Sequence, residues 1–204
     1  MTEIIEPHPL LIQYLKTANS LWTSFDNLKG TDNDSLGPQE WHYVMSNLEQ
    51  NIFLLHRLNQ RGLLPQKIKI CDAGIGLGSA LFDLYLQSLS LEGLEFEFWG
   101  IEKQAKYLEF LRLNLLPLWQ GKLYLIESDL EQEDFSPYDI VYTYSPYVKR
   151  ADLERFYQKI QHQIKTGALI IENRECGLGL DRVLEGVGGL EKIQMDDIWV
   201  FRKV

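Results

Sequence analysis

The chain has 204 residues, of which 45% are hydrophobic and 24% charged, and its formal net charge is −9. This length suits one domain with a well-buried core, and no window approaches the roughly 18 consecutive apolar residues that a membrane span needs. The negative charge, together with the lack of any basic run longer than Lys149-Arg150, disfavours DNA or RNA as a direct partner.

The first 65 residues are predicted to be helical. Apolar residues recur at helical spacing over 10–28 and again from Pro38 to Leu55, and the stretch 30–38 between them is rich in turn-forming residues. Gly62 and Pro65 end the second helix. We expect residues 1–65 to be a helical extension of the domain formed by residues 66–204 rather than an independent domain.

Short β-like runs alternate with helical patterns over residues 66–204. The runs that predict strands are 67–73, 95–102, 122–128, 139–144 and 168–173. The predicted helices are 78–90, 103–116, 150–165 and a short one over 179–186, and the tail from Glu191 predicts two closing strands. This alternation predicts an α/β fold with a doubly wound, mostly parallel sheet of seven strands whose last strand is antiparallel.

Two cysteines, Cys71 and Cys176, form no C-x-x-C pair. The first residues lack the basic start and the small-residue cleavage site of a signal peptide. These features predict a cytoplasmic protein in which Cys71 is a buried strand residue.

The first predicted strand runs into a loop with glycine at every second position, Asp72-Ala73-Gly74-Ile75-Gly76-Leu77-Gly78. In a doubly wound sheet this exit is where ligands bind, and glycine allows a ligand to approach the backbone closely. A dinucleotide-binding loop would need glycine where this chain has Ser79, and a phosphate-binding loop would need a lysine after its last glycine. The Asp72 carboxylate suits an ammonium group better than a phosphate.

This stretch resembles the first motif of class I S-adenosylmethionine (SAM)-dependent methyltransferases, D/E-x-G-x-G-x-G, at all its defined positions. The resemblance covers residues 66–204 and implies SAM as the cofactor. It implies that the amino-acid part of SAM lies against Asp72 and the loop glycines Gly74, Gly76 and Gly78. It further implies that Glu102 binds the ribose hydroxyls, that Asp129 lies near the adenine amine, and that the Leu130 N–H faces the adenine ring.

The methyl acceptor is expected at the exits of the fourth and fifth strands. Methyltransferases acting on planar amines often carry [N/D]-P-P-Y after the fourth strand, where this chain has Tyr144-Ser145-Pro146-Tyr147. Tyr144, Tyr147 and Glu172 are therefore candidates for the acceptor side, with Glu175 beside them. Tyr147 has an alternative role as a loop aromatic packed on the helix that starts at 150.

No metal is expected at this site. Glu172-Asn173 ends the fifth strand, but Tyr144 stands where a second carboxylate ligand would be needed, so Mg²⁺ is disfavoured. The four histidines show no metal-ligand spacing.

A second, short resemblance concerns Trp99-Gly100-Ile101-Glu102-Lys103 and the sequence AKYLE at 105–109. This segment is similar to the second-strand region of the non-SET histone-lysine methyltransferases, although YSPY departs from their Asn-Asn-Phe-type motif. It hints at a protein-lysine acceptor and at N-terminal helices that cover the SAM pocket. Residues 1–40 are accordingly the predicted lid; Trp41 is either a lid aromatic or a core residue.

The predicted function is transfer of the SAM methyl group to nitrogen or oxygen of a small molecule or a protein side chain. The alternative is a SAM-binding protein without transfer activity that acts as a sensor or a partner subunit. A nucleotide-dependent oxidoreductase is disfavoured by Ser79 and by the missing phosphate site.

Overall fold

The computed structural model describes residues 8–27, 53–144, 146–147, 149–173, 183–195 and 198–204. Its centre is one seven-stranded sheet with the order β3-β2-β1-β4-β5-β7-β6. The strands are β1 Lys67–Ala73, β2 Glu95–Glu102, β3 Lys122–Glu127, β4 Ile140–Thr143, β5 Leu169–Glu172, β6 Leu190–Met195 and β7 Ile198–Lys203. Strand β7 runs antiparallel to both of its neighbours and the remaining pairs are parallel, so the predicted fold class is confirmed.

The helices of the described residues lie close to their predicted places. They are α1 Pro9–Asn27, α2 Leu54–Gln60, α3 Ser79–Ser88, α4 Ala105–Asn114 and α5 Arg150–Gln163. A 3-10 turn, η2 Leu116–Leu118, comes after α4 at Pro117 because proline cannot continue a helix. Only the end of the short helix predicted over 179–186 is described, and it is a 3-10 turn, η3 Leu184–Gly186.

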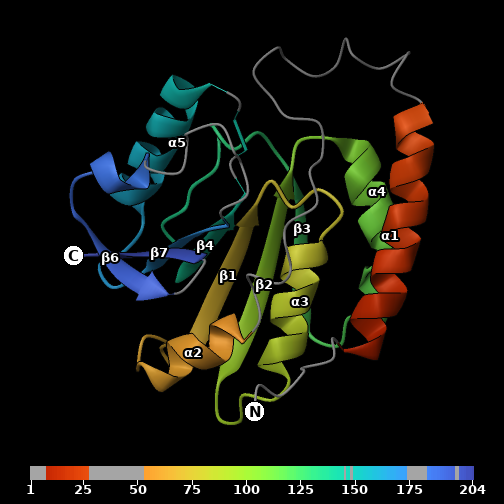
Figure 1. Cartoon of the computed structure of the whole chain (residues 1–204), viewed down its shortest axis with the longest axis horizontal. Coiled ribbons are helices and arrows are strands. Elements are labelled where there is room, and N and C mark those ends of the chain that lie inside the picture. Colours follow the sequence, from red (N-terminus) through yellow and green to blue (C-terminus); the bar gives the residue numbers. More distant parts are fainter. Residues whose placement is uncertain (1–7, 28–52, 145, 148, 174–182, 196–197) are drawn as a thin grey trace.

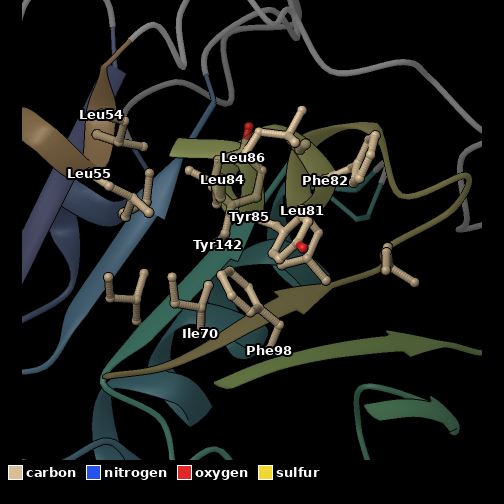
Figure 2. Close-up of a cluster of buried hydrophobic side chains, with 14 of the residues drawn as sticks. Leu54, Leu55, Ile70, Leu81, Phe82, Leu84, Tyr85, Leu86, Phe98 and Tyr142 are labelled. Atoms are coloured by element: carbon tan, nitrogen blue, oxygen red, sulfur yellow. The ribbon is translucent and has the colours of Figure 1, made fainter. Parts of the chain in front are cut away.

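Two apolar layers enclose the sheet (Figure 1). On one face α3 and α4 pack against the strands, and α1 and α2 pack against α3. Figure 2 shows this layer, where Leu54 and Leu55 of α2 and a row of α3 side chains lie above Ile70, Phe98 and Tyr142 of the strands. On the other face α5 packs through apolar side chains onto the alternate residues of the same strands.

Strand β1 lies at the centre of this arrangement, between β2 and β4. Ile68 and Ile70 face the α3 layer, whereas Cys71 and Ala73 face the α5 layer. The strand is therefore covered on both faces, as expected for the middle of a parallel sheet.

Cys71 is fully buried in this strand. Its burial, together with the smaller effect of the charges of Asp72 and Glu133, raises the pKa of its thiol well above the ordinary value.

The N-terminal helices share the α3 core with the sheet. Leu11, Tyr14 and Ala18 of α1 are buried in the same cluster as Leu55 and Leu58 of α2. Trp41 and residues 28–40 lie outside the described residues, so the division at residue 65 and the lid stay predictions. None of the helices in the described ranges combines the length and apolar character needed to cross a lipid bilayer.

Candidate functional site

The glycine loop wraps over the end of β2. Gly74, Gly76 and Gly78 have φ angles of 87°, 53° and 74°, a left-handed conformation that favours glycine at each position. The N–H groups of Gly74 and Ile75 both donate to the carbonyl oxygen of Ile101, at 3.0 and 2.9 Å. The loop then enters α3, for which Gly78 is the N-cap.

Glu102, the predicted ribose ligand, joins this loop to the exit of β2. Its Oε2 accepts a hydrogen bond from the Gly76 N–H at 3.0 Å, and its Oε1 accepts one from the Gln104 N–H at 2.9 Å. Its backbone carbonyl accepts the Ser128 N–H after β3 at 3.0 Å. Backbone N–H groups of two different segments, the glycine loop and the start of α4, thus hold both carboxylate oxygens in place.

Asp72 is the buried carboxyl of the site. Its carboxyl is 4% exposed, and no hydrogen-bond partner for it lies in the part of the chain that the structure describes. Burial, and then repulsion by Glu102, raises its pKa to about 8. A cation bound beside Asp72 would offset both effects, because the attraction between opposite charges favours the ionised form of the carboxyl.

Gly78 differs from the other two glycines in what surrounds it. A Cβ at this position would lie 2.7 Å from Leu111 Cδ2 and 2.9 Å from Leu115 Cδ2, at the end of α4. At Gly74 a Cβ would meet the Pro146 Cβ at 3.7 Å, an ordinary contact. A side chain at Gly78 would therefore have to displace two leucines at the end of α4, whereas Gly74 brings the loop beside the predicted acceptor loop at Pro146.

Asp129, the predicted adenine ligand, lies at the exit of β3. Its carboxylate forms an ion pair with Lys103 at 3.1 Å and accepts the Glu131 N–H at 3.0 Å. Partial burial raises its pKa, but the Glu131 N–H and Lys103 outweigh that effect, so the pKa lies below its usual value. Asp129 is thus an ionised acceptor at neutral pH.

The backbone at Leu130 is held by a side chain of α5. Lys159 of α5 donates through Nζ to the carbonyl oxygens of Leu130 and Glu131, at 2.8 and 2.7 Å. Within the described residues no acceptor faces the Leu130 N–H, so this donor remains available for a ligand.

The predicted acceptor residues lie mostly inside the α5 layer. The Tyr147 ring is buried and packs edge-on against Phe156 of α5, with ring centroids 5.5 Å apart, as in the alternative that the sequence left open. Glu172 is buried and accepts a 2.6 Å hydrogen bond from the Tyr157 hydroxyl, also on α5. Tyr144 is half-buried, and Glu175 lies outside the described residues.

Sequence reasoning did not single out Tyr142. This residue pairs in register with Asp72, and its hydroxyl accepts a 2.8 Å hydrogen bond from Asn173 Nδ2 at the exit of β5. The sequence analysis also missed Lys159, which donates to the Leu130 carbonyl. It missed Tyr14 as well, whose hydroxyl donates to the Leu77 carbonyl of the glycine loop. The described residues contain no group of three or more histidine, cysteine, aspartate or glutamate side chains placed to hold a metal ion.

No protein-family model matches the chain. No curated protein matches it. Solved structures do. A Listeria monocytogenes protein assigned to the class I SAM-dependent methyltransferases superposes with a TM-score of 0.55 at 14% identity, over 80% of this chain and 63% of its own. The chain thus spans less than two thirds of that protein.

Two further solved structures give the same result. A Staphylococcus aureus protein assigned as a caffeoyl-CoA O-methyltransferase has a TM-score of 0.54 at 14% identity, over 79% of this chain and 86% of its own. A SAM-dependent methyltransferase from Clostridium acetobutylicum has a TM-score of 0.50 at 12% identity, over 92% of this chain and 68% of its own. At these identities the likeness concerns the fold. This chain has the fold of the class I SAM-dependent methyltransferases.

Proposed function

We propose that this protein binds SAM at the exits of β1, β2 and β3 and transfers its methyl group to nitrogen or oxygen of an acceptor. The observation that carries the proposal is Asp72, a buried carboxyl without a described partner at the start of a left-handed glycine loop. The acceptor would be a small molecule or a protein side chain. The fold supports this general kind of reaction. The three carboxyl groups and the Leu130 N–H described above support SAM as the cofactor.

The residues present fit the cofactor group by group. Asp72 would take the ammonium group, because it is a buried acceptor whose ionisation needs a nearby cation. Glu102 would accept the ribose hydroxyls, because the Gly76 and Gln104 N–H groups hold its carboxylate at the exit of β2. Asp129 would accept from the adenine amine, and the Leu130 N–H would donate to the ring.

When bound, SAM supplies an electrophilic methyl group on a sulfonium. The chain then has to hold the acceptor in line, exclude water and take up the proton that the nucleophile loses. Tyr144, which is half-buried, directly follows β4, and Glu172 is the last residue of β5, so both belong to the two remaining strand exits. Their aromatic and acidic character suits an amine or another cation.

One observation favours the alternative of binding without transfer. Tyr147 and Glu172 are engaged by Phe156 and Tyr157 of α5. If that engagement persists when an acceptor is present, these two side chains support the fold and contribute no acceptor contact. A SAM sensor or partner subunit would need nothing more than the β1–β3 exits.

Two measurements on the full chain separate these functions. Calorimetry with SAM and with its demethylated product, S-adenosylhomocysteine, tests binding, and transfer of a radiolabelled methyl from SAM to a panel of amines, hydroxyl compounds and lysine peptides tests turnover. Binding with transfer to one acceptor class is the expected result. Binding without transfer to any acceptor would favour the alternative, and absence of binding would overturn both.

A further inference from the structure

Tyr14 connects the N-terminal helix to the glycine loop. It lies on α1 and is buried, and its ring packs edge-on against Phe82 of α3 at 5.1 Å and beside Phe110 of α4 at 6.3 Å. Its hydroxyl donates to the carbonyl oxygen of Leu77. A helix that ends at Asn27, well before the sheet begins at Lys67, therefore reaches the backbone of the loop at the exit of β1.

The Leu77 carbonyl lies between two left-handed glycines, Gly76 and Gly78. Its only hydrogen-bond donor among the described residues is Tyr14. The preceding part of the loop is held from β2, through Ile101 and Glu102. Nearer to α3, backbone hydrogen bonds hold Gly78, whose N–H donates to Ile75 and whose carbonyl accepts the Phe82 N–H, while Tyr14 holds the Leu77 carbonyl.

A loop of left-handed glycines has many alternative conformations once an anchor is removed, because glycine restricts the backbone least. When only a fraction of the molecules has the binding-competent loop, the apparent dissociation constant rises by the inverse of that fraction. This loss of affinity is expected only for ligands with a group that lies against the loop.

We propose that Tyr14 is a positioning residue that holds the glycine loop in the conformation needed by the amino-acid part of the cofactor. This inference rests on the proposed function, since it assigns that part of SAM to the loop. It gives α1 a role in cofactor binding in addition to any role as a cover over the acceptor. Tyr14 contacts neither the cofactor nor the acceptor in this assignment; it acts through the Leu77 carbonyl.

The chain offers a matched control on the same face of the sheet. Tyr85 of α3 is also buried, and its ring stacks on Trp119 at 4.1 Å. Its hydroxyl accepts the Gln120 N–H at 2.8 Å and donates to the Gln120 carbonyl at 3.2 Å, away from the glycine loop. Tyr85→Phe therefore removes a buried, hydrogen-bonded hydroxyl without touching the loop.

The test compares two probes on the full chain by calorimetry: S-adenosylhomocysteine, which contains the amino-acid part, and 5′-methylthioadenosine, which lacks it. Tyr14→Phe keeps the ring contacts, and we expect it to weaken S-adenosylhomocysteine binding about three- to tenfold, the range that one net hydrogen bond controls. Binding of 5′-methylthioadenosine should change less than about twofold. Tyr85→Phe should lower the melting temperature and leave both affinities unchanged.

The outcomes distinguish the two proposals. If the wild-type chain binds neither probe, the proposed function fails and the positioning role fails with it. If the wild-type chain binds both probes and Tyr14→Phe weakens both equally or neither, only the positioning role is overturned. Amide hydrogen exchange of ligand-free protein gives a second readout: Tyr14→Phe should speed exchange over residues 74–78 and not in β1, and exchange that rises equally in both would contradict the proposal.

Discussion

The two halves of the strand-end surface are built differently. At the exits of β1, β2 and β3, polar side chains meet the backbone of the neighbouring loops, as Glu102 does at the Gly76 N–H. At the exits of β4 and β5, the candidate side chains point into the α5 layer, where Tyr147 packs on Phe156 and Glu172 accepts from a tyrosine hydroxyl. The first half is organised around main-chain groups and the second around side chains.

This difference predicts how each half responds to substitution. A site made from left-handed backbone tolerates no added side chain, and changes there should affect cofactor binding and the fold together. A site made from buried side chains can be altered at one atom while the backbone stays in place. Substitutions in the two halves should therefore separate cofactor affinity from turnover.

The largest effect is expected at Gly78. Gly78→Ala should lower the free energy of unfolding by about 2–4 kcal/mol, because left-handed strain adds to overpacking against Leu111 and Leu115. Gly93 has a similar φ of 78° but open space around its Cβ position, so Gly93→Ala should cost about 1–2 kcal/mol from strain alone. Urea unfolding measures both, and equal losses would show that the contact with α4 contributes nothing.

The next effect concerns Glu102. Glu102→Ala should weaken S-adenosylhomocysteine binding about 10- to 100-fold, corresponding to the loss of a charged acceptor. Glu127 is the matched control, because it is exposed and pairs in register with Glu102 at the end of β3. If Glu127→Ala weakens binding as much in calorimetry, the effect is one of general charge and the ribose assignment is wrong.

Asp72 gives the site a pH dependence. Its pKa of about 8 in the free protein means that the carboxyl must lose a proton to pair with an ammonium group. Affinity for S-adenosylhomocysteine should rise about 20-fold from pH 6 to pH 7.5 and level off above pH 8, with proton release detectable in buffers of different ionisation enthalpy. A flat profile would remove Asp72 from the cofactor site.

The same group affects folding with the opposite trend. Because the pKa rises from 3.8 to about 8 on folding, its contribution to stability is present in full below pH 3.8 and is lost as the pH rises through 8. Asp72→Asn should remove this loss, so the gain in stability of the variant over wild type should grow from about pH 4 to about pH 8 and stay constant above that. Urea unfolding at about pH 5 and about pH 8.5 would measure the difference.

Substitutions at the exits of β4 and β5 should change the rate of methyl transfer and leave cofactor affinity unchanged. Glu172→Gln keeps an oxygen that can accept from Tyr157, so S-adenosylhomocysteine affinity should stay within about twofold while kcat/KM for a cationic acceptor falls about tenfold or more. Glu185→Gln is the control, an acidic residue that pairs with Lys192 at β6. Equal kcat/KM in wild type and Glu172→Gln would place the acceptor elsewhere.

No effect is expected from a chelator. Tyr144 stands where a second carboxylate ligand would be needed, so methyl transfer in EDTA should equal that in buffer. Activity that is lost in EDTA and restored by Mg²⁺ would contradict this interpretation of the β4 and β5 exits.

The fold was predictable because its signals are local. Alternating strand and helix patterns located β1 at Lys67–Ala73 and β2 at Glu95–Glu102, and the glycine spacing located the loop between β1 and α3. The ends of the predicted strands also located Glu102 and Asp129.

The contacts that organise the site were not predictable in this way. These contacts join residues that are far apart in the sequence. The hydrogen bond between Glu102 and Gly76 spans 26 residues, the one between Lys159 and Leu130 spans 29, and the one between Tyr14 and Leu77 spans 63. Such pairs depend on how the layers pack, which periodicity in one segment does not specify. Gly78 shows the same limit: its place in a cofactor motif gave no sign of its packing against α4.

The burial of Cys71 makes the centre of the sheet accessible to measurement. A thiol reacts as its thiolate, and here both burial and the raised pKa suppress that form while β1 is paired with β2 and β4. In a Cys176→Ser background Cys71 is the single thiol of the chain, so the rate of alkylation reports how often the middle of the sheet opens. A ligand that binds the folded protein should slow this labelling in proportion to its occupancy, which provides a binding assay that requires no knowledge of the methyl acceptor.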